Sequence, residues 1–313
     1  MAQTCVSSGF DKPKQAVILA AGLGTRLRPV TYYLPKPLFP VLNTPILTQI
    51  LHGFIGAGFS RVLVNVYHLS ELLTDFLRVE QFPNVNWVIE KTLMGTGGAL
   101  RNFLPYLNSN APVMVYNSDI LSNIDLDSLY RLHSGRGVGV TMLMHRRDGS
   151  NNVLCQNDRI VAFRVADKNA WTYTGIMVIE PGVIARYFPE EPSDMINCLQ
   201  NAMEDGVEVQ AVYPEDVGHV GGRFLWEDIG TVRGYLTAHA LLLHEKGTPF
   251  LLDEVRHSDQ RLILRDWVCI GKDAMLSDDT VICRSVIWPN TDASHCKEIV
   301  DRIVTPWGTL ALS

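Results

Sequence analysis

The chain has 313 residues, of which 47% are hydrophobic and 19% are charged, with 24 Gly and 16 Pro. These proportions exclude a disordered, collagen-like or coiled-coil chain and predict a globular protein with one large domain plus a smaller appendage, or two domains. Lys and Arg total 27 and Asp and Glu total 33, so the formal net charge is −6. Such a chain has no global positive field for a nucleic-acid backbone or an anionic membrane, so any phosphate site must be local.

Cysteine usage and the N-terminus bear on the compartment. The 6 cysteines form no Cys-x-x-Cys pair and no cluster with zinc-ligand spacing, which favours reduced packing thiols over a disulfide framework. The N-terminal sequence has no apolar core of a secretory signal, and no uncharged apolar run approaches the roughly 20 residues that span a bilayer. We therefore expect a cytoplasmic protein without membrane insertion.

The first half of the chain alternates predicted strands and helices. Residues 16–21 (AVILAA) are continuously apolar, as in a strand that is buried on both faces. A helix at 45–58, a strand at 61–68, a helix at 71–77, a strand at 86–89, a helix at 98–107 and a strand at 112–116 follow. Repeated βαβ units predict a Rossmann-like, doubly wound α/β fold with a mixed, mainly parallel sheet, whose ligands bind at the C-terminal ends of the strands.

The middle of the chain is less regular and predicts an added antiparallel or mixed portion of the sheet. Its expected elements are strands at 138–146, 151–156, 159–165 and 171–180, a helix at 193–204, a strand at 207–214 and a helix at 232–246. Gly247-Thr248-Pro249 then ends the last helix. We place the domain boundary there, with residues 1–249 as the main domain and 250–313 as a tail.

In the tail, the hydrophobic residues recur with a different period from that of the main domain. Aliphatic residues recur every six positions, at Leu264, Ile270, Leu276 and Ile282. Six-residue repeats are typical of the coils of a parallel β-helix, so the tail is expected to be a short hexapeptide-like segment with an irregular end. An ordinary small β-meander is the alternative. The tail is expected to pack against the main domain or against a neighbouring subunit, as in a homo-oligomer.

A glycine-rich loop after the first strand carries the clearest chemistry. Gly22 and Gly24 allow a tight turn whose N–H groups can approach phosphate oxygens, and Arg26 and Lys36 add positive charge. Leu27 stands where a dinucleotide fingerprint needs its third glycine, and no Gly-Lys-Ser/Thr of a P-loop follows. The pattern therefore favours a nucleotide polyphosphate and disfavours NAD.

The longer motif is family-specific. The run Ala20-Ala21-Gly22-Leu23-Gly24-Thr25-Arg26-Leu27-x-Pro29-x-Thr31, followed by Pro35-Lys36-Pro37-Leu38-x-Pro40, resembles the signature of sugar-1-phosphate nucleotidylyltransferases. The resemblance extends through Gly95–Ala99, Asn117-Ser118-Asp119, Tyr173-Thr174-Gly175 and Trp226–Thr231. The tail also resembles the left-handed β-helix of several members, including mannose-1-phosphate guanylyltransferases.

The resemblance implies a reaction and a set of residues. In that reaction a sugar 1-phosphate oxygen displaces pyrophosphate from the α-phosphorus of a nucleoside triphosphate, so the partners are these two substrates. It implies Arg26 and Lys36 as catalytic residues and Asp119 and Asp228 as ligands of Mg²⁺, the expected cofactor. Glu227 adjoins Asp228 but should point to the opposite face of its strand. The implied nucleotide-binding residues are Ala21, Gly22, Gly24, Thr25, Gly95, Thr96, Gly97, Gly98 and Ser118.

Two points stay open at this stage. Residues 95–98 are expected to approach the base; the alternative, the start of a helix with Thr96 as its cap, is compatible with base binding nearby. The sugar side is expected to involve Tyr173, Thr174, Gly175 and the strand-end Glu180. The family's Glu-Lys-Pro element is absent, and Lys168 or Arg164 are the candidates to replace its lysine.

The substrates also stay open. GTP with a mannose- or heptose-like 1-phosphate is favoured over UTP with an N-acetylmuramate or glucose 1-phosphate. A non-catalytic subunit that binds nucleotide sugars is the alternative from another class.

Overall fold

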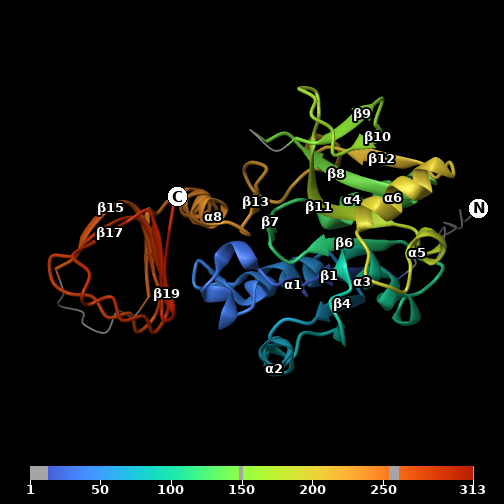
Figure 1. Cartoon of the computed structure of the whole chain (residues 1–313). Helices are drawn as coiled ribbons and strands as arrows, with labels where there is room; N and C mark the ends of the chain where they lie inside the picture. The colour runs from blue at the N-terminus through green and yellow to red at the C-terminus, as the bar shows by residue number, and fades with distance from the viewer. Residues whose placement is uncertain (1–12, 148–150, 254–260, 313) are drawn as a thin grey trace, which may run out of the picture.

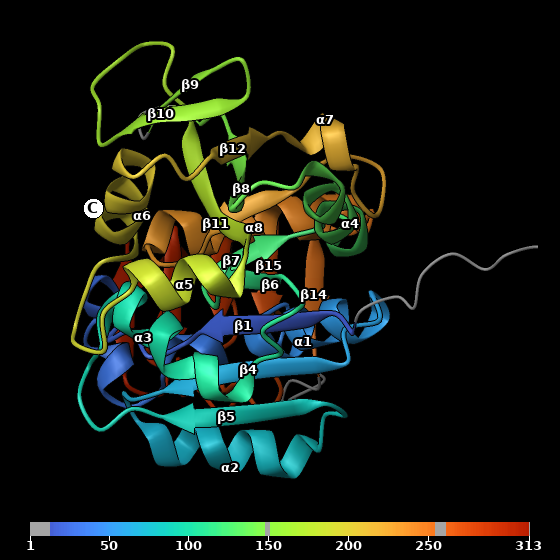
Figure 2. The same ribbon diagram turned by 90° about the vertical axis from the view of Figure 1, so that its right-hand side faces the viewer.

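A computed structural model describes residues 13–147, 151–253 and 261–312 of the chain. Within them, a nine-stranded sheet forms the centre of the molecule (Figures 1 and 2). In spatial order its strands are β5 (Val85–Ile89), β4 (Arg61–Val66), β1 (Gln15–Leu19), β6 (Val113–Asn117), β11 (Thr172–Ile179), β8 (Val140–His145), β12 (Val209–Val212), β10 (Arg159–Phe163) and β9 (Val153–Gln156). The predicted α/β architecture with a mixed sheet is confirmed.

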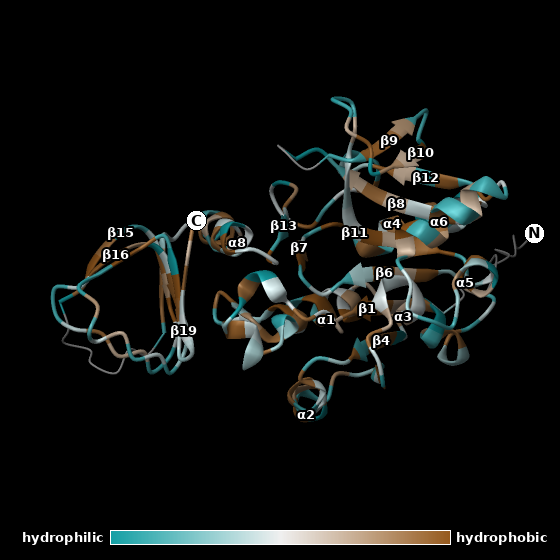
Figure 3. Cartoon of the chain, viewed as in Figure 1, coloured by the Kyte–Doolittle hydropathy of each residue, from teal (hydrophilic) through white to brown (hydrophobic). Residues whose placement is uncertain are grey.

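The direction of the strands changes at β11. Strands β5, β4, β1 and β6 pair in parallel, whereas β11 is antiparallel to both β6 and β8. The C-terminal end of β6 therefore lies beside the middle of β11, where Ile176 pairs with Tyr116. The strand β1 is apolar and buried on both faces, which is why its sequence reads as one continuous hydrophobic run (Figure 3).

Helices cover both faces of the sheet. On one face, α1 (Ile46–Gly56), α2 (Ser70–Glu80), α4 (Leu126–Arg136) and α8 (Val232–Glu245) share a buried core with alternate residues of β1, β4 and β6. On the other face lie α3 (Gly95–Phe103), α5 (Pro181–Tyr187) and α6 (Met195–Glu204), in front of the strands in Figure 2. The helix α1 buries Ile46, Leu47, Ile50, Leu51 and Phe54, the spacing that predicted it.

Shorter elements connect these layers. They are the 3₁₀ turns η1 (Thr25–Leu27), η2 (Val30–Tyr32), η3 (Lys36–Leu38) and η4 (Leu104–Tyr106), the short helix α7 (Pro214–Val217), and the strand pairs β2 (Pro40–Val41) with β3 (Thr44–Pro45) and β7 (Ile120–Ser122) with β13 (Trp226–Asp228).

The tail consists of strands that stack mostly in parallel. They are β14 (Phe250–Leu252), β15 (Ile263–Ile270), β16 (Val281–Ile287), β17 (Glu298–Val300), β18 (Arg302–Thr305) and β19 (Gly308–Ala311). Leu264 pairs with Ile282, eighteen residues on, so one coil takes three six-residue steps. Parallel pairing of β14, β15 and β16 excludes the β-meander, in which neighbours are antiparallel. That the coils wind as a left-handed β-helix stays a prediction.

The tail packs against the main domain. The buried Trp288 contacts Phe39 edge-on and donates from its indole Nε1 to Tyr235 Oη of α8 at 2.9 Å, and Tyr235 in turn donates to Pro40 O. Asn43 Nδ2 donates to Asp253 Oδ2 at 2.8 Å. The segment after the glycine-rich loop is therefore held between α8 and the tail (Figure 1).

Two further sequence predictions concern cysteines and membranes. The cysteines that the structure describes, Cys155, Cys198, Cys269, Cys283 and Cys296, are free thiols, and Cys5 lies outside the described residues. Among the described residues, no helix combines the length and the apolar character that crossing a bilayer requires.

Candidate active site

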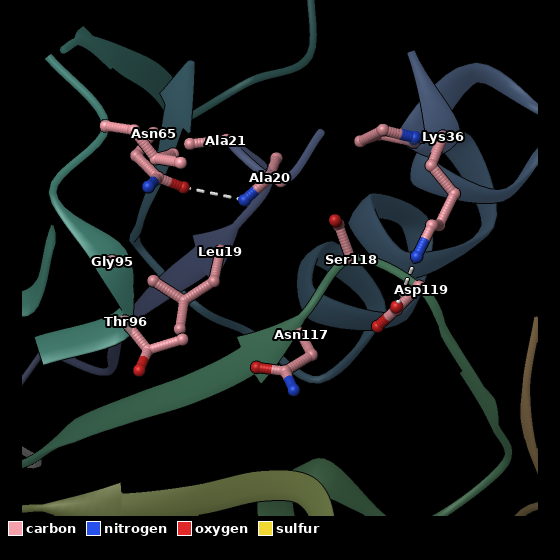
Figure 4. A pocket seen from close by; sticks show the side chains of 13 residues that line it. Leu19, Ala20, Ala21, Lys36, Asn65, Gly95, Thr96, Asn117, Ser118 and Asp119 are labelled. Atoms are coloured by element: carbon pink, nitrogen blue, oxygen red, sulfur yellow. Dashed lines mark hydrogen bonds and ion pairs between the residues drawn. The ribbon is translucent and has the colours of Figure 1, made fainter. Parts of the chain in front are cut away.

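Two cavities adjoin at the C-terminal end of β6. The β1 cavity, of about 290 Å³, lies between the loop after β1, the start of α3 and the residues that end β6 (Figure 4). The β11 cavity, of about 270 Å³, lies between the end of β6, the first residues of β11 and the strand β13. Asn117 and Asp119 line both cavities. Two ligands bound side by side would meet at these two residues.

The glycine-rich loop forms one wall of the β1 cavity. Gly24 has φ 61°, and a Cβ there would lie 2.7 Å from Thr31 Cγ2, so both the backbone and the packing require glycine. Gly22 and Ala21 line the cavity, and a Cβ at Gly22 would meet no other described atom within 4 Å. The loop backbone is thus accessible to a ligand at the position where the sequence predicted phosphate binding.

The predicted cationic residues follow directly. Thr25 begins η1, which carries Arg26, and the Arg26 side chain is 57% exposed with Nη2 at 3.8 Å from Asp228 Oδ2. Lys36, on η3, is only 13% exposed and its Nζ lies 2.8 Å from Asp119 Oδ2. Ser118 is buried at the rim of the β1 cavity and its N–H donates to Leu19 O at 3.1 Å.

The structure brings the two predicted metal-binding aspartates together, although they are far apart in sequence. Antiparallel pairing of β7 with β13 sets Asp228 opposite Ile120, and the Ile229 N–H donates to Asp119 O at 3.0 Å. Both carboxylates line the β11 cavity. Glu227 does not line this cavity; it is buried and accepts from Nη2 of Arg147, which does, at 2.8 Å. Burial raises the pKa of Glu227, and the Arg147 guanidinium opposes that rise.

Gly230 lies among the charged side chains of the site, and no role of its own could be assigned to it from the sequence. Its N–H donates to Asp228 Oδ1 at 2.7 Å. A Cβ at this position would lie 2.7 Å from Arg26 Nη2, 2.7 Å from Asp228 Oδ1 and 3.0 Å from Lys36 Nζ. The absence of a side chain therefore allows one carboxylate and two cations to share a small space.

A buried hydrogen-bond network below the β1 cavity was also missed. Asn65 Oδ1 accepts from the Ala20 N–H at 2.6 Å (Figure 4). Asn65 Nδ2 donates to Glu90 Oε1 at 2.6 Å. Glu90 Oε2 accepts from the Met94 N–H at 3.0 Å. The network ties the end of β1 to the turn before α3, and a lone Asn and a lone Glu carry no sequence signal for such a role.

The segment from Gly95 to Gly98 is the first turn of α3, so the helix alternative is the one observed, with a different role for Thr96. Thr96 Oγ1 makes no capping hydrogen bond to α3 and instead accepts from the Met195 N–H at 2.9 Å, at the start of α6. A Cβ at Gly95 or Gly97 would lie 2.5 Å from Ser193 atoms, and one at Gly98 would lie 2.6 Å from Glu191 O. These glycines are thus explained by packing against residues 191–194, while Gly95 and Thr96 also line the β1 cavity.

On the β11 side, Tyr173 and Gly175 lie where the sequence placed the sugar. Gly175 has φ 81°, and a Cβ there would be 2.8 Å from Asn117 Nδ2, so glycine lets β11 pass close to the end of β6. Thr174 contributes backbone to the cavity wall, but its buried hydroxyl donates to Leu143 O at 2.8 Å and is turned into the protein. Burial raises the pKa of Tyr173, so its hydroxyl stays protonated.

Three candidates on the sugar side need correction. Glu180 follows the C-terminal end of β11, which is antiparallel, so it lies at the opposite edge of the sheet, where Ile179 pairs with Val113 and His133 Nε2 is 3.3 Å from Glu180 Oε1. Arg164 is held by Asp194 and Asn197 of the α6 region, at 2.7 Å and 2.6 Å. Lys168 is exposed in the loop between β10 and β11 and is not among the residues that line the β11 cavity.

The residues present fit a hard divalent cation bound jointly with substrate. Within the described residues no group of three or more His, Cys, Asp or Glu side chains forms a complete metal centre. Asp119 and Asp228 supply carboxylate oxygens, the ligands that Mg²⁺ prefers, and Mg²⁺ commonly takes its other ligands from phosphates and water. Both carboxylates already face cations, so the site is one of closely balanced charge.

The fold and the site together define an α/β domain with two adjoining cavities at the end of β6, one of them beside the glycine-rich loop. Residues 15–154 match the family described as nucleotidyl transferase, and the chain thus carries a nucleotidyl transferase domain. The family resemblance predicted from the loop motif is confirmed.

Several characterised proteins are similar to this chain. A mannose-1-phosphate guanylyltransferase of Mycobacterium tuberculosis is 29% identical over 88% of this chain and 77% of its own length. A UTP–glucose-1-phosphate uridylyltransferase of Synechocystis is 30% identical over 72% of this chain and 62% of its own length. The chain therefore spans less than two thirds of the second relative.

Solved structures share the fold. HddC from Yersinia pseudotuberculosis, solved with GMP-PN, has a TM-score of 0.60 at 20% identity and covers 73% of this chain and 99% of its own. A glucose-1-phosphate thymidylyltransferase assigned in Bacillus anthracis has a TM-score of 0.62 at 19% identity, covering 73% and 94% of the two chains. At these identities the likeness bears on the fold alone.

Proposed function

We propose that the protein transfers a nucleotidyl group from a nucleoside triphosphate to a sugar 1-phosphate and releases pyrophosphate. The observation that carries the proposal is the pair of adjoining cavities, which share Asn117 and Asp119 and have Arg26, Lys36 and Asp228 at their junction. The triphosphate would occupy the β1 cavity, along the glycine-rich loop. The sugar 1-phosphate would occupy the β11 cavity.

The β11 cavity has polar atoms suited to a hydroxylated ligand. Asn117 Oδ1 and Tyr173 Oη are buried and have no hydrogen-bond partner among the described residues. Both residues line the β11 cavity. A buried polar atom without a partner costs about 1–3 kcal/mol, so a small side-chain rotation that brings these atoms to a ligand in the cavity is favoured. Sugar hydroxyls can donate to the Asn117 amide oxygen and accept from the Tyr173 hydroxyl.

The reaction needs positioning and charge neutralisation rather than a protein nucleophile. An oxygen of the sugar phosphate attacks the α-phosphorus, a new P–O bond forms, and the bond to the β-phosphate oxygen breaks, so that pyrophosphate leaves with the electron pair. Arg26 and Lys36 would neutralise charge that moves onto the leaving phosphates, and the loop backbone would orient the triphosphate.

A divalent cation, for which we propose Mg²⁺, would be held by Asp119 and Asp228. When bound, it would supply further neutralisation of the phosphate oxygens. The proposed nucleotide-binding set otherwise keeps Ala21, Gly22, Gly24, Thr25, Gly95, Thr96 and Ser118, which line or border the β1 cavity.

For the substrates we propose GTP with a mannose- or heptose-like 1-phosphate. The mycobacterial relative named as a mannose-1-phosphate guanylyltransferase supports this choice. UTP with glucose 1-phosphate is the second candidate, supported by the Synechocystis relative.

The test is a matrix of each triphosphate against a panel of sugar 1-phosphates with Mg²⁺, read as pyrophosphate release. We expect release that requires both substrates, and a loss of at least about 10²-fold in turnover in both Asp119→Ala and Asp228→Ala. Absence of pyrophosphate from every pair, with nucleotide sugars still bound, would favour the non-catalytic alternative instead.

We propose the same boundary as the sequence indicated, with residues 1–249 catalytic and 250–313 forming a left-handed, hexapeptide-like coil. Parallel pairing with an eighteen-residue repeat supports the coil. For the homo-oligomer through the tail, light scattering of the full chain is the test, since a particle of one 35.0 kDa chain would exclude it.

A further inference from the structure

We propose that Arg147 is the residue that anchors the phosphate of the sugar 1-phosphate, with Glu227 and Trp226 as the groups that position it. This inference rests on the proposed function, and it names a cation for a site where the sequence offered Lys168 or Arg164. Neither of those two lies in the β11 cavity, whereas Arg147, just after β8, does.

Charge at the cavity wall is the first argument. Among the described residues that line the β11 cavity, Arg26 and Arg147 are the cationic ones, and Asp119 and Asp228 are the anionic ones. Arg26 lies 3.8 Å from Asp228. A Cβ at Gly230 would be 2.7 Å from Arg26 Nη2 and 3.0 Å from Lys36 Nζ, so Arg26 is at the end of the β11 cavity nearer Lys36, which lines the β1 cavity. A sugar phosphate that enters this cavity brings negative charge towards two carboxylates, and Arg147 is the second cation in reach to offset it.

The way Arg147 is held is the second argument. Glu227 Oε1 accepts from Arg147 Nη2 at 2.8 Å, and the Arg147 Cζ lies 5.4 Å from the centroid of the Trp226 ring. Glu227 is 7% exposed whereas the Arg147 side chain is 31% exposed, so the buried carboxylate confines a guanidinium that a ligand can still reach. A guanidinium has five N–H donors, so it can remain paired with Glu227 and still donate to phosphate oxygens.

The strand β13 places two carboxylates, Glu227 and Asp228, next to two different arginines. Trp226, Glu227 and Asp228 are consecutive residues of β13, with Glu227 and Asp228 on opposite faces. Asp228 faces the cavity junction beside Arg26, while Glu227 reaches Arg147. One short strand thus sets the spacing between the cation for the leaving phosphates and the cation for the attacking phosphate.

Steady-state kinetics with each substrate varied in turn test this assignment. Arg147→Gln is expected to raise the KM for the sugar 1-phosphate at least about tenfold and to leave the KM for the triphosphate within about twofold. Arg147→Lys keeps the positive charge but lacks the planar set of N–H donors of a guanidinium, so it should raise the KM for the sugar 1-phosphate by an intermediate factor. Arg146→Gln is the matched control, because Arg146 stacks on Trp171 at 4.5 Å and does not line the cavity, and it should behave as wild type.

Two further variants distinguish phosphate anchoring by Arg147 from a purely structural role of its ion pair. Glu227→Gln keeps Arg147 but weakens the contact that positions its guanidinium. It should raise the KM for the sugar 1-phosphate by a smaller factor than Arg147→Gln does. The double variant Arg147→Gln/Glu227→Gln replaces the ion pair by two neutral amides, so it leaves no unpaired buried charge, and it should still show the full increase in the KM for the sugar 1-phosphate.

The outcomes distinguish this inference from the proposed function. If the wild type is active and Arg147→Gln changes both KM values equally, or neither, the anchor assignment is wrong while the function stands. If the wild type releases no pyrophosphate from any pair, the function fails first. In that case calorimetric titration with sugar 1-phosphate alone still tests the anchor, by comparing the wild type with Arg147→Gln. Equal affinities of the two proteins would overturn the assignment of Arg147 as the anchor.

Discussion

Substitution of Gly230 by Ala tests whether the charged groups at the cavity junction must keep their observed spacing. An alanine Cβ would lie 2.7 Å from both Arg26 Nη2 and Asp228 Oδ1, whereas ordinary contact begins at 3.4 Å. These groups must therefore retreat by about 0.7 Å, and Lys36 Nζ, at 3.0 Å, by somewhat less. Misplacement on the order of 1 Å at a reacting centre can cost about 10²-fold, so we expect a fall of that size in kcat, about 2.7 kcal/mol.

The same substitution should leave the fold nearly unchanged. Gly230 does not occupy the left-handed backbone region, and two of the three displaced atoms are the mobile ends of long side chains. We expect the free energy of unfolding in urea to change by less than about 1 kcal/mol. Gly222→Ala is the matched control, since its Cβ meets no described atom within 4 Å. A Gly230→Ala enzyme within twofold of wild-type kcat would refute the reasoning.

Three other predictions concern charge, the tail and pH. Arg26→Ala should lower kcat more than it raises the KM for the triphosphate, because its charge matters most as pyrophosphate departs; a change in KM alone would make Arg26 a binding residue only. Tyr235→Phe leaves Pro40 O and Trp288 Nε1 buried without their partner, so the free energy of unfolding should fall by about 2–4 kcal/mol in urea titrations; a loss under about 0.5 kcal/mol would contradict the packing of the tail. Burial lowers the pKa of His239 to about 4, so between about pH 6.5 and 4 the unfolded chain binds a proton at this residue more readily than the folded chain does. The free energy of unfolding should therefore fall by about 3 kcal/mol as the pH is lowered through that window, and by clearly less in His239→Gln.

The central part of the site could be predicted from sequence because its elements obey local rules. A glycine-rich loop after a buried strand marks a phosphate site, and the C-terminal ends of parallel strands share one edge of the sheet. Asp119 follows β6 and lies at that edge, although its selection as a metal ligand also rested on the family resemblance. Asp228 required the family resemblance, because nothing local shows that β13 pairs with β7.

The failures have a common physical cause in non-local structure. Glu180 was placed at the site by the rule that ligands bind at strand ends, but β11 is antiparallel to β6, and its C-terminal end therefore lies at the far edge. Gly97 and Gly98 are glycine because residues 191–194 pass over them, a contact nearly a hundred residues away in sequence. Arg147 gave no signal, since a single arginine after a strand is usually a solvated side chain.

The position of the tail bears on how Arg26 and Lys36 are held. Lys36 lies on η3, which precedes Phe39 and Pro40, and these two residues contact Trp288 and Tyr235. The stack of Trp307 on Tyr33, with ring centroids 5.7 Å apart, adds a contact from the β18–β19 hairpin to the stretch between Arg26 and Lys36. A segment that carries two cations close together is opposed by their mutual repulsion, and burial of Phe39 against Trp288, together with the more exposed stack of Tyr33 on Trp307, offsets that cost. The tail is therefore more than an appendage, because it supports the segment between Arg26 and Phe39.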